Sequence, residues 1–191
     1  MKRFTILFLV LITTTLLAQN TSEERLPYSQ LPEYSETFTA GTVAARMVDA
    51  LGFRFYWASE GLSDKDLAYK PNEDARSVAE TMTHILDLSY VIVNSTLKIA
   101  NEKVDRSEMS YIQKREQALM NFKTAAEILR TSDDISQFKI IFGEREVSFW
   151  NQINGPIADA IWHCGQIASF RRISGNVINP NVNHFSGTVK E

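Results

Sequence analysis

The sequence predicts an all-α protein, a four-helix bundle with one short β-hairpin before the last helix. Apolar residues recur at three- and four-residue steps through four segments of similar length, which is the spacing of amphipathic helices. Strand-like alternation is confined to one short segment, Phe138–Trp150. Four helices with so little strand signal are typical of a bundle built around one apolar core.

The N-terminus has the pattern of a secretory signal peptide. Met1–Arg3 is basic, Phe4–Leu17 is almost wholly apolar, and Ala18 precedes a polar run. We expect cleavage after Ala18 and export to the periplasm or the medium, with no membrane association afterwards. An uncleaved anchor is the alternative, although the apolar run is shorter than the ~20 residues that a spanning helix needs. Residues 19–37 are polar and are predicted as an extended lead-in.

The rest of the chain suits a single domain, with a helical bundle at 38–176 and an irregular tail at 177–191. The net charge is -3 and both signs are interspersed, which argues against nucleic acid as a partner. A small-molecule substrate and a homodimer stay open. Cys164 is the only cysteine, so no internal disulfide can form, and we expect it to be a small core residue.

The first three helices have recognisable periodicity. The first is predicted at about 38–61. The second starts at Ser77, because Glu80 lies three residues later in a capping-box arrangement, and it is expected to reach about Lys103. The third covers 107–131.

The last helix follows the hairpin. Alternating apolar residues on both sides of a turn that begins at Gly143 predict the hairpin within Phe138–Trp150. The fourth helix is predicted at 156–174, with Pro156 in its first turn and Gly175 just past its end, the positions that proline and glycine prefer.

Three side chains on the second and last helices form a candidate metal site. Asp159 and His163 are four residues apart and therefore share a helix face, and Gln166 lies on the same side. His84 borders the buried face of the second helix. If the two helices face each other, two imidazoles and one carboxylate meet, a set that suits Zn, Ni, Fe or Mn with positions left open. The alternatives are a hydrogen-bonded core histidine and an aspartate that complements the helix dipole.

Several neighbours of this site have two interpretations. Gln166 can orient a metal ligand or a bound water, or tie the last helix to the hairpin. Arg171 and Arg172 can bind a substrate carboxylate, or complement the dipole at the helix C-terminus. Trp150 and Trp162 are expected in the core or in a pocket wall.

A family resemblance extends the metal interpretation. His84 within SVAETMTHILDLS, and HCGQ at 163–166 followed by FRRISGN at 170–176, make the chain similar to the DinB/YfiT-like superfamily of metal-dependent enzymes. The similarity runs from about Phe38 to Asn176. It implies a four-helix bundle of up-down-down-up topology with a metal held between the second and last helices.

The resemblance also implies a site with one departure. The family's usual ligands are three histidines, one on the second helix and an HxxxH pair on the last, and Asp159 stands here for the first histidine of that pair. His84, Asp159 and His163 would then be ligands and Gln166 would support them. The implied chemistry is thiol-dependent transfer or isomerisation, and hydrolysis is equally consistent with the residues. The alternative is a non-catalytic exported binding module with a degenerate or structural metal site.

Overall fold

The computed structural model describes residues 26–190. The predicted signal peptide, residues 1–18, and the first part of the lead-in lie outside the described residues. The elements in chain order are α1 (Ala40–Ser59), α2 (Asp64–Ala68), α3 (Val78–Leu97), α4 (Tyr111–Arg130), the 3₁₀ turn η1 (Ile135–Gln137), β1 (Ile140–Phe142), β2 (Arg145–Val147), α5 (Phe149–Gln152), the π-helical turn η2 (Ile153–Ile157), α6 (Ala158–Ser174), β3 (Val182–Asn183) and β4 (Thr188–Val189). The mostly helical prediction and the small hairpin before the last helix are confirmed.

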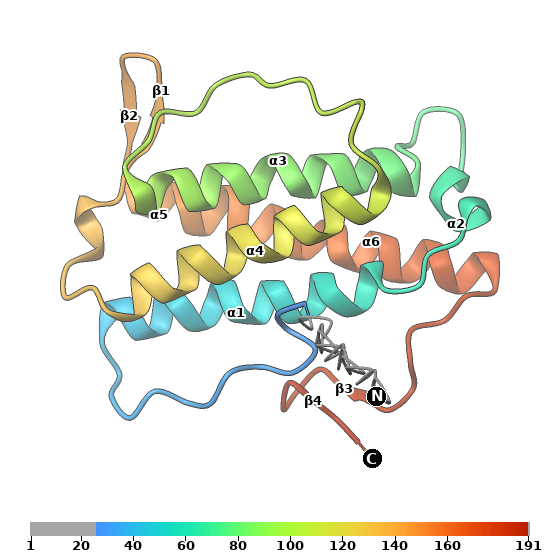
Figure 1. Cartoon of the computed structure of the whole chain (residues 1–191), viewed down its shortest axis with the longest axis horizontal. Helices are drawn as coiled ribbons and strands as arrows, with labels where there is room; N and C mark the ends of the chain where they lie inside the picture. Colours follow the sequence, from blue (N-terminus) through green and yellow to red (C-terminus); the bar gives the residue numbers. More distant parts are fainter. Residues whose placement is uncertain (1–25, 191) are drawn as a thin grey trace, which may run out of the picture.

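The four long helices, α1, α3, α4 and α6, lie side by side (Figure 1). The closest packing is between α1 and α4 and between α3 and α4, while α6 contacts both α1 and α3. Figure 1 also shows the connection 98–110 returning along α3, so that α4 begins near the end of the molecule where α3 begins. This crossing segment and the α3–α6 contact are the two features of the fold that shape the candidate site.

Side-chain caps set the helix boundaries. The predicted capping box is present at α3, where the Ser77 amide donates to the Glu80 carboxylate at 2.7 Å and the Glu80 amide donates to the Ser77 hydroxyl at 3.2 Å. The helix ends at Leu97 rather than near Lys103, because Lys98 adopts a left-handed conformation with φ of 58°. A residue in the left-handed conformation commonly ends a helix. That residue is usually glycine or asparagine, so a lysine at this position did not predict the end of the helix.

The other early helices agree with the prediction to within a few residues. α1 is two residues shorter at each end than the range 38–61. α4 begins at Tyr111 instead of Ser107, because Ser110 is the residue whose hydroxyl accepts from an amide of the first turn, that of Gln113. Two serines, Ser107 and Ser110, precede this helix, and the sequence alone did not say which one caps it.

The start of the last helix differs from the prediction. The chain is already helical at Phe149, and Pro156 lies inside the π-helical turn η2, between α5 and α6, rather than in a first turn. Proline in an ordinary helix loses a hydrogen bond and clashes with an upstream carbonyl, and a wider π turn is one way to accommodate it. Gly175 ends α6 with φ of 97°, as predicted.

The tail is less irregular than expected. Residues 182–183 and 188–189 pair as the antiparallel strands β3 and β4. The Leu31 amide donates to the Gly187 carbonyl at 2.8 Å, so the lead-in and the tail are joined. Within residues 26–190 there is no helix with the length and apolarity needed to cross a bilayer.

The core draws on all four long helices, and the start of α1 packs tightly against the backbone at the end of α4. Large side chains that are fully buried include Leu51, Phe53 and Phe55 of α1, Met82, Ile85, Leu86 and Ile92 of α3, Leu119, Phe122 and Leu129 of α4, and Ile167 of α6. A Cβ atom at Gly41 would lie 2.3 Å from the Ser132 carbonyl oxygen and 2.4 Å from that of Leu129. The start of α1 can therefore meet the end of α4 only at a residue without a side chain.

We predict that Gly41→Ala destabilises the protein by about 1–3 kcal/mol, because the clash is with backbone that cannot rotate away. Gly165→Ala is the matched control. A Cβ there meets nothing within 4 Å, and alanine in a helix interior is favoured over glycine by up to about 1 kcal/mol. Urea unfolding followed by circular dichroism measures both. Equal stability of the two variants would contradict the close approach.

Candidate metal centre

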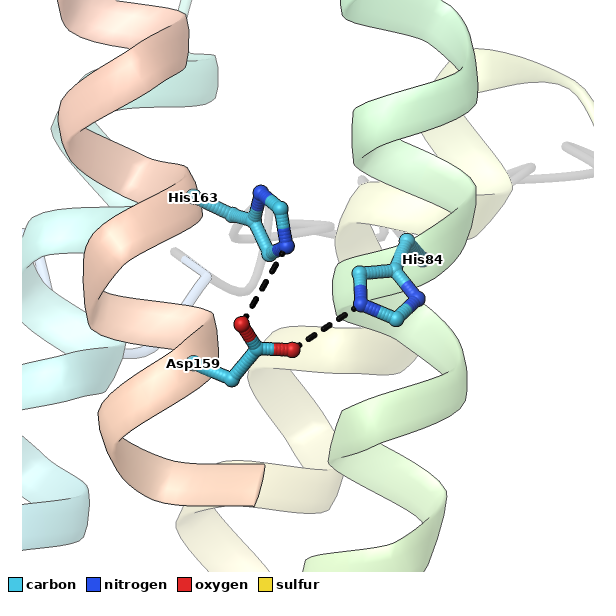
Figure 2. A group of neighbouring side chains, drawn as sticks. All are labelled: His84, Asp159 and His163. Atoms are coloured by element: carbon cyan, nitrogen blue, oxygen red, sulfur yellow. Dashed lines mark hydrogen bonds and ion pairs between the residues drawn. The ribbon is translucent and has the colours of Figure 1, made fainter. Parts of the chain in front are cut away.

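The structure brings the three predicted ligands together. His84 extends from α3, and Asp159 and His163 extend from successive turns of α6 toward it (Figure 2). Each of the three offers a ligand atom, and these atoms all lie within 4.8 Å of one another. The spatial meeting that the sequence predicted is therefore present, and the group can hold a metal ion.

Asp159 lies between the two histidines. Its Oδ2 is 3.0 Å from His84 Nε2 and its Oδ1 is 3.4 Å from His163 Nε2. The two imidazole rings meet edge to face, with centroids 4.7 Å apart and planes at 87°. One carboxylate therefore contacts both helices through its two oxygens.

The three side chains of the cluster differ in their exposure to solvent. The side chain of His163 is 11% exposed, that of His84 is 29% exposed, and that of Asp159 is 41% exposed. A bound ion would therefore be anchored on a buried imidazole and open to solvent on the carboxylate side. This is the arrangement that leaves room for water or substrate.

Gln166 orients the buried histidine. Its Oε1 lies 2.6 Å from His163 Nδ1, so in this amide orientation the ring proton sits on Nδ1 and donates to Gln166. The lone pair of Nε2 then points toward Asp159. A lone pair facing a carboxylate oxygen is unfavourable unless a cation lies between them, either a proton or a metal ion. Of the two interpretations of Gln166, the ligand-orienting one matches this contact.

Two contacts within the cluster are near the donor spacing expected around a zinc ion. Zinc–nitrogen and zinc–oxygen bonds of ~2.0–2.1 Å in tetrahedral geometry put neighbouring donors about 3.3–3.4 Å apart. The two contacts of Asp159, 3.0 Å from Oδ2 to His84 and 3.4 Å from Oδ1 to His163, are close to this value, and with one ligand atom from each residue the three atoms lie within 4.8 Å of one another. Two imidazoles and one carboxylate leave at least one position for a non-protein ligand.

The helical segment before Asp159 is fixed to α3. Gln152, the last residue of α5, is buried, and its Nε2 donates to the Val91 and Ile92 carbonyls of α3 at 3.2 and 3.3 Å. The π turn with Pro156 follows directly and leads into α6. This anchor sets where α6 starts relative to α3, and so where Asp159 meets His84.

A cavity that the sequence did not reveal begins beside the cluster. Asp87 is three residues after His84, and it accepts from Arg106 Nη1 at 2.7 Å. The Arg106 guanidinium lies 4.1 Å over the Tyr90 ring. These residues line a cavity of about 540 Å³ between α3, the connection 98–110 and the hairpin residue Phe142. Neighbours three apart on a helix have Cβ atoms about 5–6 Å apart, so the cavity starts about one turn from His84.

The structure corrects the suggested role of Arg171 in substrate binding. Arg171 is buried. Its guanidinium donates to the carbonyls of Trp57, Ala58 and Asn176 and to the Asn176 side chain, at 2.7–3.1 Å. Its donors are thus used to join the end of α6 to the end of α1. Arg172 is exposed, and its role stays a prediction.

The RRISGN segment belongs to this same junction. Asp66 of α2 accepts from the Ser174 and Ser63 hydroxyls and from Asn176 Nδ2. Burial alone would raise the pKa of Asp66, but the hydrogen bonds from Asn176, Ser174 and Ser63 outweigh it and hold the pKa well below its usual range. The segment therefore closes α6 onto α2 and α1, away from the ligand cluster.

Two further expectations have opposite outcomes. Trp150 and Trp162 are largely exposed, so their assignment to the core is wrong, and neither lines the cavity beside Asp87. Their apolarity suggested burial, but their positions in the helical turns direct them outward.

Cys164 is buried as expected, and burial raises the pKa of its thiol to about 12. It stays protonated at neutral pH and does not join the ligand set.

Comparisons with protein-family models, with curated proteins and with solved structures returned no match. The resemblance to the DinB/YfiT-like superfamily therefore stays a prediction that depends on the residues quoted for it.

We predict that Asp66→Asn lowers the free energy of unfolding at pH 7 by about 2 kcal/mol, because the amide cannot accept all the bonds that the carboxylate accepts. The folded-state pKa is lower than the unfolded one, so the stabilisation is present above about pH 4 and is lost as the pH falls toward the folded-state value. The wild type should therefore lose stability between pH 5 and 3 more steeply than the variant.

Urea unfolding at a series of pH values measures this difference. Asp64→Asn, at an exposed position of the same short helix, is the control and should leave the pH slope unchanged. Parallel slopes for the wild type and Asp66→Asn would contradict the role of this carboxylate.

Proposed function

We propose that the protein is an exported, DinB-like metal-dependent enzyme that holds a divalent ion, Zn, Ni, Fe or Mn, between α3 and α6. His84, Asp159 and His163 are the ligands and Gln166 supports His163. The single observation that carries the proposal is the convergence of the three ligand atoms within 4.8 Å of one another. The up-down-down-up topology is part of the proposal and is supported by the long connection that returns along α3.

Each residue of the proposed site would have a separate role around such an ion. Gln166 keeps the proton of His163 on Nδ1, so that Nε2 is free to act as a ligand. Asp159 lowers the net positive charge of the site. A divalent ion with an open position acidifies a water or accepts an anionic group such as a thiolate. The cavity that starts at Asp87, about one helical turn from His84, gives a substrate room to lie along α3.

We favour hydrolysis over thiol-dependent transfer as the reaction class. The predicted export separates the protein from the small thiols of the cytosol, which a thiol-dependent reaction would need as a co-substrate. Hydrolysis needs only water as the second reactant. Both reactions use the same three ligands, so this choice does not alter the proposed site.

A non-catalytic binding module is the second candidate. The two imidazoles already contact the Asp159 carboxylate at 3.0 and 3.4 Å, so the cluster can be satisfied by protons alone, or can hold a metal only to brace α3 against α6. The two candidates differ in coordination. Three protein ligands plus a solvent ligand favour the enzyme, whereas a fourth protein ligand favours a structural site.

We predict that the purified protein, stripped with a chelator and then titrated with ZnCl₂, NiCl₂ or MnCl₂ in a calorimeter, binds about one ion per chain for at least one of the three metals. His163→Ala should abolish binding without loss of helix content. A metal at 100 times its Kd should raise the free energy of unfolding by about 2.7 kcal/mol. Absorption spectra of the Co²⁺-substituted protein report the coordination number.

The matched control is His184→Ala, which removes the exposed histidine of the tail and should bind as the wild type does. No binding of any of the three metals by the wild type, or equal losses in His163→Ala and His184→Ala, would overturn the site. Unfolding of the metal-free wild type would instead identify the ion as structural.

A separate prediction concerns Gln166. Gln166→Ala should weaken metal affinity by about 10- to 100-fold, the usual effect of removing the partner of a ligating histidine. Gln166→Glu keeps an acceptor at the same place and should retain most of the affinity. Competition against a chelating dye measures both, and equal affinities of the wild type and Gln166→Ala would assign the glutamine no part in metal binding.

A further inference from the structure

A second cavity lies on another part of the molecule. It has a volume of about 550 Å³ and is enclosed by residues 33–38 of the lead-in, the first half of α1, and Arg130 at the end of α4. None of these segments carries a residue of the candidate metal centre. The volume lies within the range of ~300–1,000 Å³ that is usual for small-molecule sites.

The walls of this cavity are apolar and unusually exposed. Phe38 is 95% exposed and Tyr34 is 74% exposed. Val43 and Met47 of α1 face the same cavity, and Val43 is exposed as well. Large apolar side chains that gather around one hollow on the surface often mark a binding site.

The charged groups of the cavity are two guanidinium groups, Arg46 and Arg130, and two carboxylates, Glu33 and Asp49. Arg46 donates to the Pro32 carbonyl at 2.7 Å and lies 4.6 Å from the centroid of the Tyr34 ring. It therefore has a fixed place in the wall. Among residues 26–190, no carboxylate forms an ion pair with it, so its charge is available to a ligand.

The one carboxylate inside the cavity is already used. Asp49 is buried at the floor, where one oxygen accepts from the Tyr28 hydroxyl at 3.2 Å and the other accepts from Arg130 Nη2. The remaining acidic residue, Glu33, is exposed, where water and salt screen its charge. The four charged side chains that line the cavity therefore sum to zero, and Arg46 is the cation among them that forms no ion pair within residues 26–190.

We propose that this cavity binds an amphipathic carboxylate, with the hydrocarbon part against Phe38, Val43 and Met47 and the carboxylate on Arg46. An apolar body matches the walls, and a planar carboxylate matches the forked donors of a guanidinium. A cationic ligand would meet an Asp49 carboxylate that is already paired with Arg130 and hydrogen-bonded to Tyr28, and the other carboxylate of the cavity, Glu33, is exposed to screening by water and salt. A neutral ligand would leave the Arg46 charge without a partner.

The direct test uses 11-(dansylamino)undecanoic acid as a fluorescent probe below its micelle concentration. We expect saturable binding at one site per chain. Dodecanoate should displace the probe at least about 10-fold more effectively than 1-dodecanol, because a bond between ionised groups is among the stronger hydrogen bonds. Equal displacement by the acid and the alcohol, or no saturable binding, would overturn the proposal.

Variants locate the site. Arg46→Gln should weaken probe binding at least about 10-fold, and Arg145→Gln, which removes an exposed arginine of β2, should leave it unchanged. Met47→Trp should fill the cavity and abolish binding. If that variant fails to fold, Val43→Glu serves in its place, because Val43 is already exposed and the new charge would repel a carboxylate. Unchanged binding in Arg46→Gln would overturn the role of Arg46.

The same titration separates this site from the metal centre. Probe binding should be the same in His163→Ala and in the wild type, with or without added metal, because no residue is shared between the two sites. Loss of probe binding in His163→Ala, with its fold intact, would place the probe at the metal centre and overturn the proposal. A failure of metal binding would leave it standing.

Discussion

The carboxylate of Asp159, held between His84 and His163, is the contact on which the functional interpretation of this protein depends. It joins side chains from two helices that are far apart in the sequence. Its stabilising effect is small, because partly exposed ion pairs contribute only about 0–1 kcal/mol. The cluster therefore does not hold the helices together. The rest of the fold must therefore keep the three side chains in place, and most of the contacts at the two ends of α6 contribute to this.

Both ends of α6 are fixed by groups that have no part in the chemistry. Upstream, buried Gln152 donates to two carbonyls of α3. Downstream, Arg171 and Asn176 join the helix end to α1 and α2. With both ends fixed, Asp159 and His163 have little freedom to move relative to His84. A metal or catalytic site requires such rigid positioning. The two neighbouring segments thus differ in role: HCGQ carries residues of the cluster, and RRISGN fixes the end of the helix.

Much of the fold and the ligand set could be predicted because they depend on local signals. Helix faces follow from apolar spacing, and Ser77 with Glu80 marks a helix start directly. The meeting of His84 with Asp159 needed only that α3 and α6 be neighbours. The π turn at Pro156 and the left-handed Lys98 could not be predicted, since their conformations depend on tertiary packing. The cavity beside Asp87 was missed because it is formed by a connection whose path no local pattern specifies. The buried role of Arg171 was missed because two of its acceptors, the carbonyls of Trp57 and Ala58, lie more than a hundred residues away in the sequence.

The aspartate in place of a histidine also bears on which chemistry the site favours. A carboxylate ligand contributes a negative charge, so an ion held by two histidines and one carboxylate has a lower net charge than one held by three histidines. A lower charge weakens the attraction for an anionic thiolate. Two histidines with one carboxylate is also a ligand set used by catalytic zinc sites of peptidases. For the enzyme proposed above, the carboxylate of Asp159 therefore points the same way as the predicted export, toward water rather than a thiol as the second reactant.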